Sequence, residues 1–230
     1  MDDTSKASRI VLSVDVGGSH VKCLTSAGGT PQKADSGSKM SASQMCDAVN
    51  DMMAGQHYDC VTIGFPGPVI HNRPISEPHN LGSGWVGFDY AAALGKPVRI
   101  VNDALMQALG SYDGGRMLFL GLGTGLGAAM IVDGIAEPME LAHLPYKKGK
   151  TFEDYVGEAS RKKRGNKHWR KTVFDIVERI TAALEPDYVV IGGGNVDHLK
   201  ELPPKCRRGD NDNAFAGGFR VWANKGLTEE

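Results

Sequence analysis

The feature that most constrains the fold is a strand–turn–strand pattern that occurs twice along the chain. Residues 9–26 read RIVLSVDVGGSHVKCLTS, where two glycines separate two short apolar runs. Residues 117–134 read MLFLGLGTGLGAAMIVDG and repeat the arrangement around a second glycine-rich turn. Short apolar runs that end at glycine are typical of strands joined by a tight turn. We therefore interpret the two copies as an internal repeat, and expect two similar halves.

The remaining segments alternate between helix and strand. We expect a helix over 41–55 that begins with a capping box of Ser41 and Gln44, strands over 60–65 and 98–102, a helix over 103–111, a helix over 172–187, a strand over 188–194, a last helix over 213–225, and loops over 27–40 and 71–87. This order predicts an α/β fold in which helices cover the sheets. The boundary near 111–116 predicts an N-terminal lobe of residues 1–111 and a C-terminal lobe of residues 112–230.

The first turn has the residue types of a phosphate site. Gly17 and Gly18 have no Cβ, so their amides can approach an anion closely, with the small hydroxyl of Ser19 beside them. Asp15 would repel phosphate unless Mg²⁺ lies between the two, directly or through water. Lys22 could supply a compensating positive charge. A plain β-hairpin explains one such turn equally well, but two such turns in one chain favour phosphate binding.

Two further motifs follow strands. Gly192 and Gly193 make a third glycine run directly after the strand expected at 188–194. Asn102 and Asp103 end another strand where a helix begins. The commonest use of such a pair is a helix cap, while a carboxylate there could also accept a proton from a hydroxyl group.

Taken in order, these motifs resemble those of the ROK family (repressor, open reading frame, kinase), a group that contains sugar kinases. The resemblance is carried by DVGGSHVK, GFPGPV, NLGSGW, VNDA, GLGTGLG, ELAH and IGGG, which span residues 11 to 194. Within the family, the lysine of DVGGSHVK and the WVG at 85–87 are similar to those of polyphosphate glucokinases. The resemblance implies a two-lobed hexokinase/actin-like (ribonuclease H-like) fold with internal duplication. It also implies a hexose kinase that uses ATP, polyphosphate or both with Mg²⁺, and a homodimer.

The resemblance also assigns residues position by position. Asp103 matches the catalytic base. The matching sugar contacts are Gly67, Asn80, Asn102, Glu140, His143 and Glu153. The matching donor-binding residues are Asp15, Gly17, Gly18, Ser19, Lys22, Gly123, Thr124, Gly125, Gly192 and Gly193.

The sequence departs from the family after His143. Most members carry a zinc site there, built from one histidine and three clustered cysteines, whereas LPYKKGKTFEDY contains no cysteine. We therefore expect no structural zinc and a loop held by packing. Ala142 stands where glycine is usual, and its methyl group could tilt His143. The segment after residue 194 is short, which predicts a reduced pocket for adenine.

A basic run, RKKRGNKHWRK, covers residues 161–171. It contains no acidic residue, although the whole chain has a net charge of −1. A solvated helix face is the ordinary explanation of such a run. Our hypothesis is that this run, with Lys147, Lys148 and Lys150, guides a polyphosphate donor. Nucleic acid is another ligand for basic runs, but no recognisable nucleic-acid fold accompanies this one.

Composition limits the remaining classes of function. No run approaches the roughly 18 apolar residues of a membrane span, and the four cysteines, Cys23, Cys46, Cys60 and Cys206, lack metal-type spacing and are expected to be free thiols. We expect a cytoplasmic enzyme that binds neither membrane nor nucleic acid. The alternative to a kinase is a non-catalytic, sugar-sensing ROK-like protein.

Overall fold

The computed structural model describes residues 9–223 of the 230-residue chain. They divide into two compact units, each of which is described by itself. Of the described residues, 9–106 and 214–223 make up the first unit, and Gln107–Asn213 make up the second. The expected lobes differ from these units in two respects. The division falls after Met106 rather than after residue 111, and residues 214–223 belong to the first unit.

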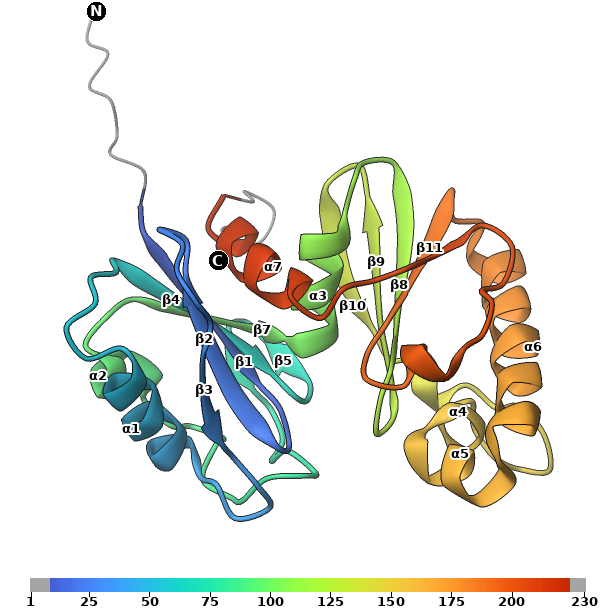
Figure 1. The fold of residues 1–230 in the computed structure, drawn as a ribbon, viewed down its shortest axis with the longest axis horizontal. Helices are drawn as coiled ribbons and strands as arrows, with labels where there is room; N and C mark the ends of the chain where they lie inside the picture. The colour runs from blue at the N-terminus through green and yellow to red at the C-terminus, as the bar shows by residue number, and fades with distance from the viewer. Residues whose placement is uncertain (1–8, 224–230) are drawn as a thin grey trace, which may run out of the picture. The chain divides into compact units, whose positions relative to one another are not determined.

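The first unit is built on a five-stranded sheet with the order β3-β2-β1-β4-β7 (Figure 1). Its strands are β1 (Val11–Val16), β2 (His20–Thr25), β3 (Gln32–Asp35), β4 (Cys60–Phe65) and β7 (Val98–Asn102). β2 runs antiparallel to both β1 and β3, whereas β1, β4 and β7 run parallel to one another. A separate two-stranded sheet pairs β5 (Val69–Ile70) with β6 (Arg73–Pro74).

The second unit contains another five-stranded sheet with the order β10-β9-β8-β11-β12. Its strands are β8 (Arg116–Leu122), β9 (Leu126–Val132), β10 (Ile135–Met139), β11 (Tyr188–Gly192) and β12 (Cys206–Arg208). Three antiparallel strands again precede two parallel ones. The two sheets therefore share one topology, which confirms the duplication predicted from the repeated strand–turn–strand pattern.

Two helices cover one face of the first sheet, α1 (Ala42–Met52) and α2 (Tyr90–Leu94). The predicted capping box is confirmed, because the Ser41 side chain accepts from the Gln44 amide and the Gln44 side chain accepts from the Ser41 amide. Met45 and Val49 of α1 pack with Trp85 and Ile63 in the apolar core on this side.

The last described helix, α7 (Asn213–Val221), packs on β1 and β4 of the same unit. The buried Thr62 hydroxyl donates to the Gly218 carbonyl at 2.7 Å. A Cβ at Gly218 would overlap the Ser13 hydroxyl. Gly218 therefore permits close contact between helix and sheet, although glycine lowers helix propensity. The expected helix extended to residue 225, and residues 224–225 lie outside the described range.

The helices of the second unit lie before its first strand and between its later strands. They are α3 (Asp103–Ser111), which begins in the first unit, the 3₁₀ helices η1 (Leu141–His143) and η2 (Val196–His198), and α4 (Glu153–Val156), α5 (Glu158–Arg164) and α6 (Asn166–Leu184). The predicted apolar stripe of α6 is confirmed, since Val173, Ile176, Val177 and Ile180 are buried against the sheet.

Several short elements lie where loops were expected or no structure was assigned. β3 lies within the expected loop 27–40 and β6 within the expected loop 71–87, and β10, β12 and α2 were also missed. The β3 residues are mostly exposed and polar, so they lack the apolar alternation that identifies a strand. Among the described residues, no helix is long and apolar enough to cross a membrane.

Candidate functional site

The parallel strands of the first sheet end at one common edge. In their register Asp15 lies opposite Gly64, and Phe65 lies opposite Asn102. The segments that follow β1, β4 and β7 therefore leave the sheet on the same side. The carboxyl edge of parallel strands is where α/β folds commonly bind ligands. This edge brings together the predicted phosphate turn at Gly17, the predicted sugar contact Gly67 and the predicted base Asp103.

The first glycine turn is tight and lies against the predicted sugar contact Asn80. The Gly17 amide donates to the His20 carbonyl at 2.9 Å, and the Ser36 hydroxyl donates to the Gly17 carbonyl at 2.6 Å. A Cβ at Gly18 would lie 3.3 Å from the Cβ of Asn80. The structure thus places the predicted sugar contact Asn80 beside the predicted phosphate turn, while Gly18 and Ser19 remain exposed.

Asp15 and Lys22 lie opposite each other in the antiparallel pairing of β1 with β2. Burial raises the pKa of Asp15, and the Lys22 ammonium offsets part of that rise. A nearby positive charge favours the ionised form of such a buried carboxyl group. A carboxylate such as that of Asp15 is the kind of hard oxygen ligand that Mg²⁺ prefers, and Mg²⁺ binding by Asp15 stays a prediction.

Asn102 caps α3, as the ordinary interpretation of an Asn-Asp pair predicts. Its Oδ1 accepts from the Ala104 amide at 2.9 Å and from the Leu105 amide at 3.2 Å. Its Nδ2 donates to the Gly67 carbonyl at 3.0 Å. One side chain therefore fixes the start of the helix and ties the loop after β4 to it. The role of sugar ligand stays a prediction for Asn102.

Asp103 is the first residue of α3, and its side chain is half-buried. Its Oδ1 accepts from the Ala104 amide at 2.8 Å. The cap and the helix start fix the backbone that carries this carboxylate, because the Asn102 amide oxygen holds the same turn. A carboxylate on a rigid helix end is suited to accept a proton from a bound hydroxyl group.

The second glycine turn, in the second unit, lies against Glu153. The Gly123 amide donates to the Gly125 carbonyl at 3.1 Å, and Thr124 is exposed at the tip. The Leu126 amide donates to Glu153 Oε2 at 3.2 Å. A Cβ at Gly125 would overlap the same carboxylate. The predicted sugar contact Glu153 and the predicted donor turn therefore lie together.

Asn195 supports this turn and was missed by the sequence interpretation. It is buried, its Nδ2 donates to the Gly123 carbonyl at 2.8 Å, and its Oδ1 accepts from Arg161 Nε at 3.1 Å. Its position after the third glycine run was the available signal, although nothing in the sequence indicates the partner 72 residues away.

The third glycine run has a packing explanation. A Cβ at Gly192 would lie 2.9 Å from the Phe119 ring, and one at Gly193 would overlap the Leu122 carbonyl. Gly193 also has a φ of +82°, which L side chains rarely adopt. These two glycines therefore let β11 leave the sheet close to β8. Donor binding by Gly192 and Gly193 stays a prediction.

Glu140 directly precedes η1 and His143 is its last residue, and both are exposed. His143 Nε2 lies 3.5 Å from Glu140 Oε2. Between them the Ala142 methyl group is 3% exposed and belongs to the apolar core of the second unit. The extra methyl group relative to the usual glycine is thus accommodated by packing in the core, while Glu140 and His143 remain exposed.

The donor set after His143 does not fit a zinc ion. Residues 144–152 contain no cysteine. Within residues 9–223, no group of three or more His, Cys, Asp or Glu side chains is placed to hold a metal ion. Absence of structural zinc stays a prediction that metal analysis of the purified protein tests.

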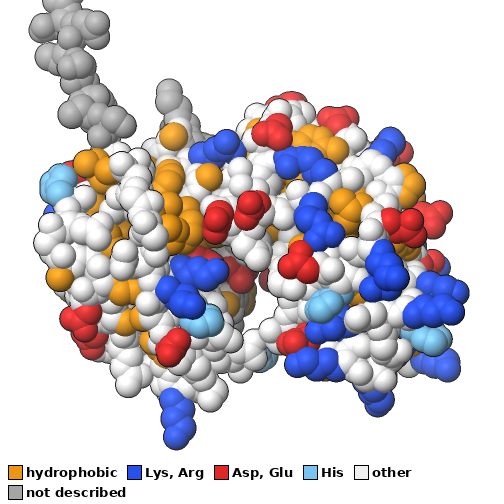
Figure 2. All heavy atoms as spheres, viewed as in Figure 1, with side chains coloured by type: hydrophobic (Ala, Val, Ile, Leu, Met, Phe, Trp, Pro, Cys, Tyr) orange, Lys and Arg blue, Asp and Glu red, His pale blue; other side chains and the backbone are white. Residues whose placement is uncertain are grey.

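The basic run is divided between structural and solvent-facing side chains. Lys162 pairs with Glu158 at 2.8 Å, Arg164 stacks on the Tyr155 ring at 3.9 Å, and Arg170 donates to the His198 carbonyl at 2.6 Å. Lys163, Lys167 and Lys171 are exposed, and none of them pairs with a carboxylate in the described part of the chain. Figure 2 shows Lys and Arg side chains gathered over the region of α4 to α6.

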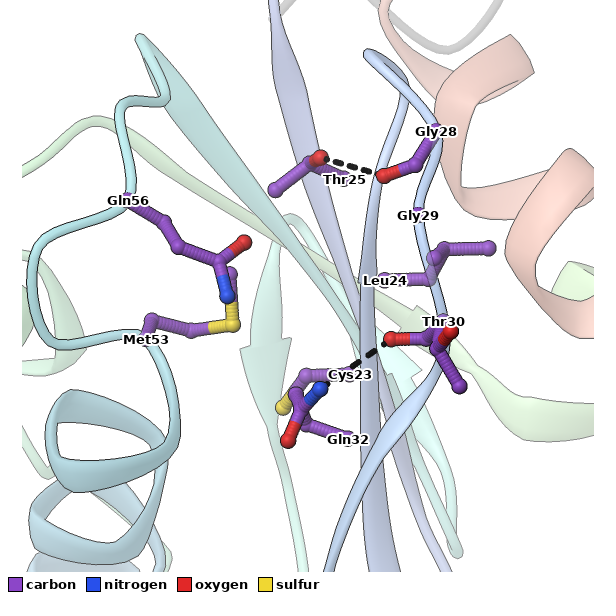
Figure 3. Close-up of a pocket in the computed structure, with 9 residues that line it drawn as sticks. All are labelled: Cys23, Leu24, Thr25, Gly28, Gly29, Thr30, Gln32, Met53 and Gln56. Carbon is purple, nitrogen blue, oxygen red and sulfur yellow. Dashed lines mark hydrogen bonds between the residues drawn. The ribbon is translucent and has the colours of Figure 1, made fainter.

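A cavity of about 200 Å³ lies apart from these residues, between the end of α1 and the loop that follows β2 (Figure 3). Two of its polar side chains bond to the backbone, since Thr25 donates to the Gly28 carbonyl and Gln32 to the Thr30 carbonyl. Burial raises the pKa of the Cys23 thiol to about 12, so that thiol is neutral. The cavity contains none of the predicted site residues.

Comparison with known proteins places the chain in a family. A model described as the ROK family matches residues 11–137, more than half of the chain. The chain belongs to the ROK family. The polyphosphate glucokinase of Mycobacterium tuberculosis is 29% identical over 147 residues, which cover 57% of this chain and 55% of that protein. The chain thus matches about half the length of this curated relative.

Solved structures share the fold over nearly the whole chain. The inorganic polyphosphate/ATP-glucomannokinase from Arthrobacter sp. strain KM has a TM-score of 0.81 at 22% identity, covering 94% of this chain and 98% of that one. A ROK family glucokinase from Streptomyces griseus, solved with glucose and AMPPNP, has a TM-score of 0.73 at 15% identity, covering 92% and 98%. These matches confirm the predicted two-lobed, hexokinase/actin-like α/β fold.

Proposed function

We propose that this protein is a hexose kinase that transfers a phosphoryl group from ATP, polyphosphate or both to the 6-hydroxyl of glucose or a related hexose. The observation that carries the proposal is the common edge of β1, β4 and β7. There Asp103 begins α3 beside the Gly67 loop, to which Asn102 binds, and Asn80 lies against the glycine turn at Gly18.

Asp103 is the proposed general base. A sugar hydroxyl keeps its proton near neutral pH, so its attack on phosphorus is helped by a carboxylate that accepts the proton in the transition state. Such catalysis contributes roughly 10²–10⁴-fold to a rate. The Asn102 cap fixes the turn from which Asp103 projects, so that the carboxylate does not have to be ordered during the reaction.

Phosphoryl transfer depends mainly on positioning and charge neutralisation. The amides of the two glycine turns would bind phosphate oxygens, and Lys22 would supply positive charge in the first unit. A bound Mg²⁺ would neutralise charge on the donor phosphates, and Asp15 is the residue that would hold it, directly or through water. The partly compensated burial of Asp15 supports that assignment.

A polyphosphate donor would require a row of cations that remain available to it. Lys163, Lys167 and Lys171 meet this requirement better than Lys162 or Arg164, whose charges are engaged with Glu158 and Tyr155. Exposed lysines interact with a polyanion through screened charges, so this contribution weakens strongly as ionic strength rises. We propose that these three lysines form the polyphosphate contact.

The alternative is a sugar-sensing protein without turnover. A ROK family transcriptional regulator also shares the fold, with a TM-score of 0.71 at 14% identity, so the fold alone does not separate the two functions. The test crosses glucose, mannose and other hexoses with ATP and polyphosphate, and measures donor consumption. Sugar-dependent consumption supports the kinase, whereas sugar binding without consumption of either donor supports the sensor.

A further inference from the structure

The segment between His143 and Glu153 forms a tight β-hairpin. The Phe152 amide donates to the Leu144 carbonyl at 3.0 Å, the Tyr146 amide donates to the Lys150 carbonyl at 2.8 Å, and Pro145 bridges to Thr151. The reversal is made by Lys148 and Gly149, which have φ values of +55° and +70°. Successive left-handed residues are the preferred way to reverse a short hairpin.

The first and last residues of this hairpin are adjacent in sequence to two predicted sugar contacts. His143 directly precedes Leu144, and Glu153 directly follows Phe152, so each lies one residue outside the hydrogen-bonded pair Leu144–Phe152. Any opening of the hairpin would therefore separate the His143 and Glu153 backbones. Their spacing depends on whatever keeps the hairpin closed.

An isolated two-stranded hairpin is marginally stable in water. This hairpin is bound to α6 by side-chain hydrogen bonds. The Tyr146 hydroxyl donates to Asp175 Oδ2. Lys147 Nζ lies 2.7 Å from the Tyr146 hydroxyl and 3.2 Å from Asp175 Oδ2, and Arg179 Nε donates to that same oxygen at 3.2 Å. The Tyr146 hydrogen bond, with the two cations, lowers the pKa of Asp175 to about 2.

Aromatic packing holds the same tyrosine from the other side. The Tyr146 ring meets the Phe152 and Tyr155 rings edge-on, at centroid distances of 5.6 Å and 4.8 Å. Asp154 accepts from the Thr151 amide at 2.9 Å, which fixes the start of α4 next to Glu153. Tyr146 is thus the residue that connects the hairpin strands, α4 and α6.

We propose that Tyr146 and Asp175 are positioning residues for the acceptor sugar: their hydrogen bond fastens the hairpin 144–152 to α6 and so sets the spacing of His143 and Glu153. Side-chain hydrogen bonding and ring packing keep the hairpin closed, and its residues include no cysteine that could hold a zinc ion instead. The inference rests on the proposed function, because it takes His143 and Glu153 to contact the sugar.

The test compares Tyr146→Phe, which keeps the ring and removes the hydroxyl, with Asp175→Asn, which keeps an oxygen that can accept from Tyr146. The matched control is Tyr112→Phe, which removes a tyrosine hydroxyl bound to the Gly115 carbonyl elsewhere in the second unit. We expect Tyr146→Phe to raise the glucose KM and the calorimetric glucose Kd about five- to tenfold, the effect of losing one hydrogen bond. The donor KM should stay within about twofold, and Asp175→Asn should retain most of the affinity.

Amide hydrogen exchange over residues 144–153 provides the readout that does not depend on activity. Exchange should accelerate there in Tyr146→Phe and remain unchanged in α6. The inference is overturned if Tyr146→Phe binds glucose as the wild type does, or if its exchange is unchanged.

The outcomes separate the inference from the proposed function. If the wild type consumes no donor with any hexose while Tyr146→Phe weakens glucose binding, the kinase proposal fails and the positioning role stands. If the wild type turns over sugar and Tyr146→Phe has an unchanged sugar KM, the positioning role fails and the kinase stands. If the wild type binds no hexose, both are wrong.

Discussion

Asn102 offers the sharpest structural prediction, because its side chain makes two separable sets of hydrogen bonds. Its oxygen caps α3 through the Ala104 and Leu105 amides, and its NH₂ group donates to the Gly67 carbonyl. Asn102→Ser keeps a capping oxygen but is too short to provide the amide donor. Asn102→Ala removes both interactions. The pair of variants therefore measures each interaction separately.

The magnitudes follow from these contacts. A net hydrogen bond contributes about 0.5–1.5 kcal/mol, so Asn102→Ser should lower the free energy of unfolding by about 1 kcal/mol. Loss of an N-cap costs about 0.5–2 kcal/mol more, so Asn102→Ala should lose about 2 kcal/mol in total. For a chain of this size each kcal/mol corresponds to roughly 2–4 °C in the midpoint of thermal unfolding.

Urea denaturation and thermal unfolding measure the stabilities, and steady-state kinetics measures the consequence for Asp103. We expect kcat/KM for the sugar to fall more in Asn102→Ala than in Asn102→Ser, since only the alanine variant releases the turn that carries the base. Equal stability of the two variants would show that Asn102 does not cap α3 in solution. Equal stability of the serine variant and the wild type would show that the Gly67 contact contributes nothing.

Three further predictions concern packing, pH and charge. Gly193→Ala should lower the free energy of unfolding by about 2 kcal/mol or more, because Gly193 has a positive φ and its Cβ would overlap Leu122. The matched control Gly194→Ala has nothing within 4 Å of its Cβ, so its free energy of unfolding should stay within about 0.5 kcal/mol of the wild type. Equal losses in the two variants would contradict the packing explanation. The pKa of Asp175 is lowered from 3.8 to about 2, so the stabilising effect of its carboxylate is present above about pH 4 and is lost as the pH falls towards 2. The difference in free energy of unfolding between the wild type and Asp175→Asn should therefore vanish over that pH range. A difference that stays constant in urea titrations across the range would refute the assignment. Replacing Lys163, Lys167 and Lys171 with Glu should raise the polyphosphate KM more than tenfold at low salt and leave the ATP KM within about twofold. As a control, replacing the exposed Lys33, Lys200 and Lys205 with Glu should change neither KM. Equal effects of the two sets would exclude a local polyphosphate contact.

Local sequence signals predicted the elements that carry the edge of the first sheet. The apolar runs at 60–65 and 98–102 are strands with those bounds, and α3 begins at Asp103 as expected. These elements were predictable because each is defined by residues adjacent in sequence. The repeated hairpins were equally clear, since both copies combine short apolar runs with a glycine turn.

Long-range side-chain contacts were not predictable. The Asn195 bond to the Gly123 turn and the Tyr146 bond to Asp175 join residues 72 and 29 positions apart. The packing of α7 on β1 and β4 depends on Gly218, which by propensity alone argued against a helix. In each case tertiary contact determines the outcome, and no local pattern indicates the partner.

The glycine runs have more than one structural role. Gly18 lies at an exposed turn beside Asn80, as a ligand-binding glycine should, whereas Gly193 fills a close contact with Leu122. The sequence shows the same residue type in both places. Only the surroundings of each missing Cβ distinguish the two uses.

The most direct test of the central claim is turnover by Asp103→Asn, measured together with calorimetric binding of the hexose. The variant should fold and bind sugar as the wild type does, because the Asn102 cap and the Gly67 contact are unchanged, while kcat falls by about 10²–10⁴-fold. Turnover close to that of the wild type would contradict the assignment of Asp103 as the group that accepts the proton from the sugar hydroxyl.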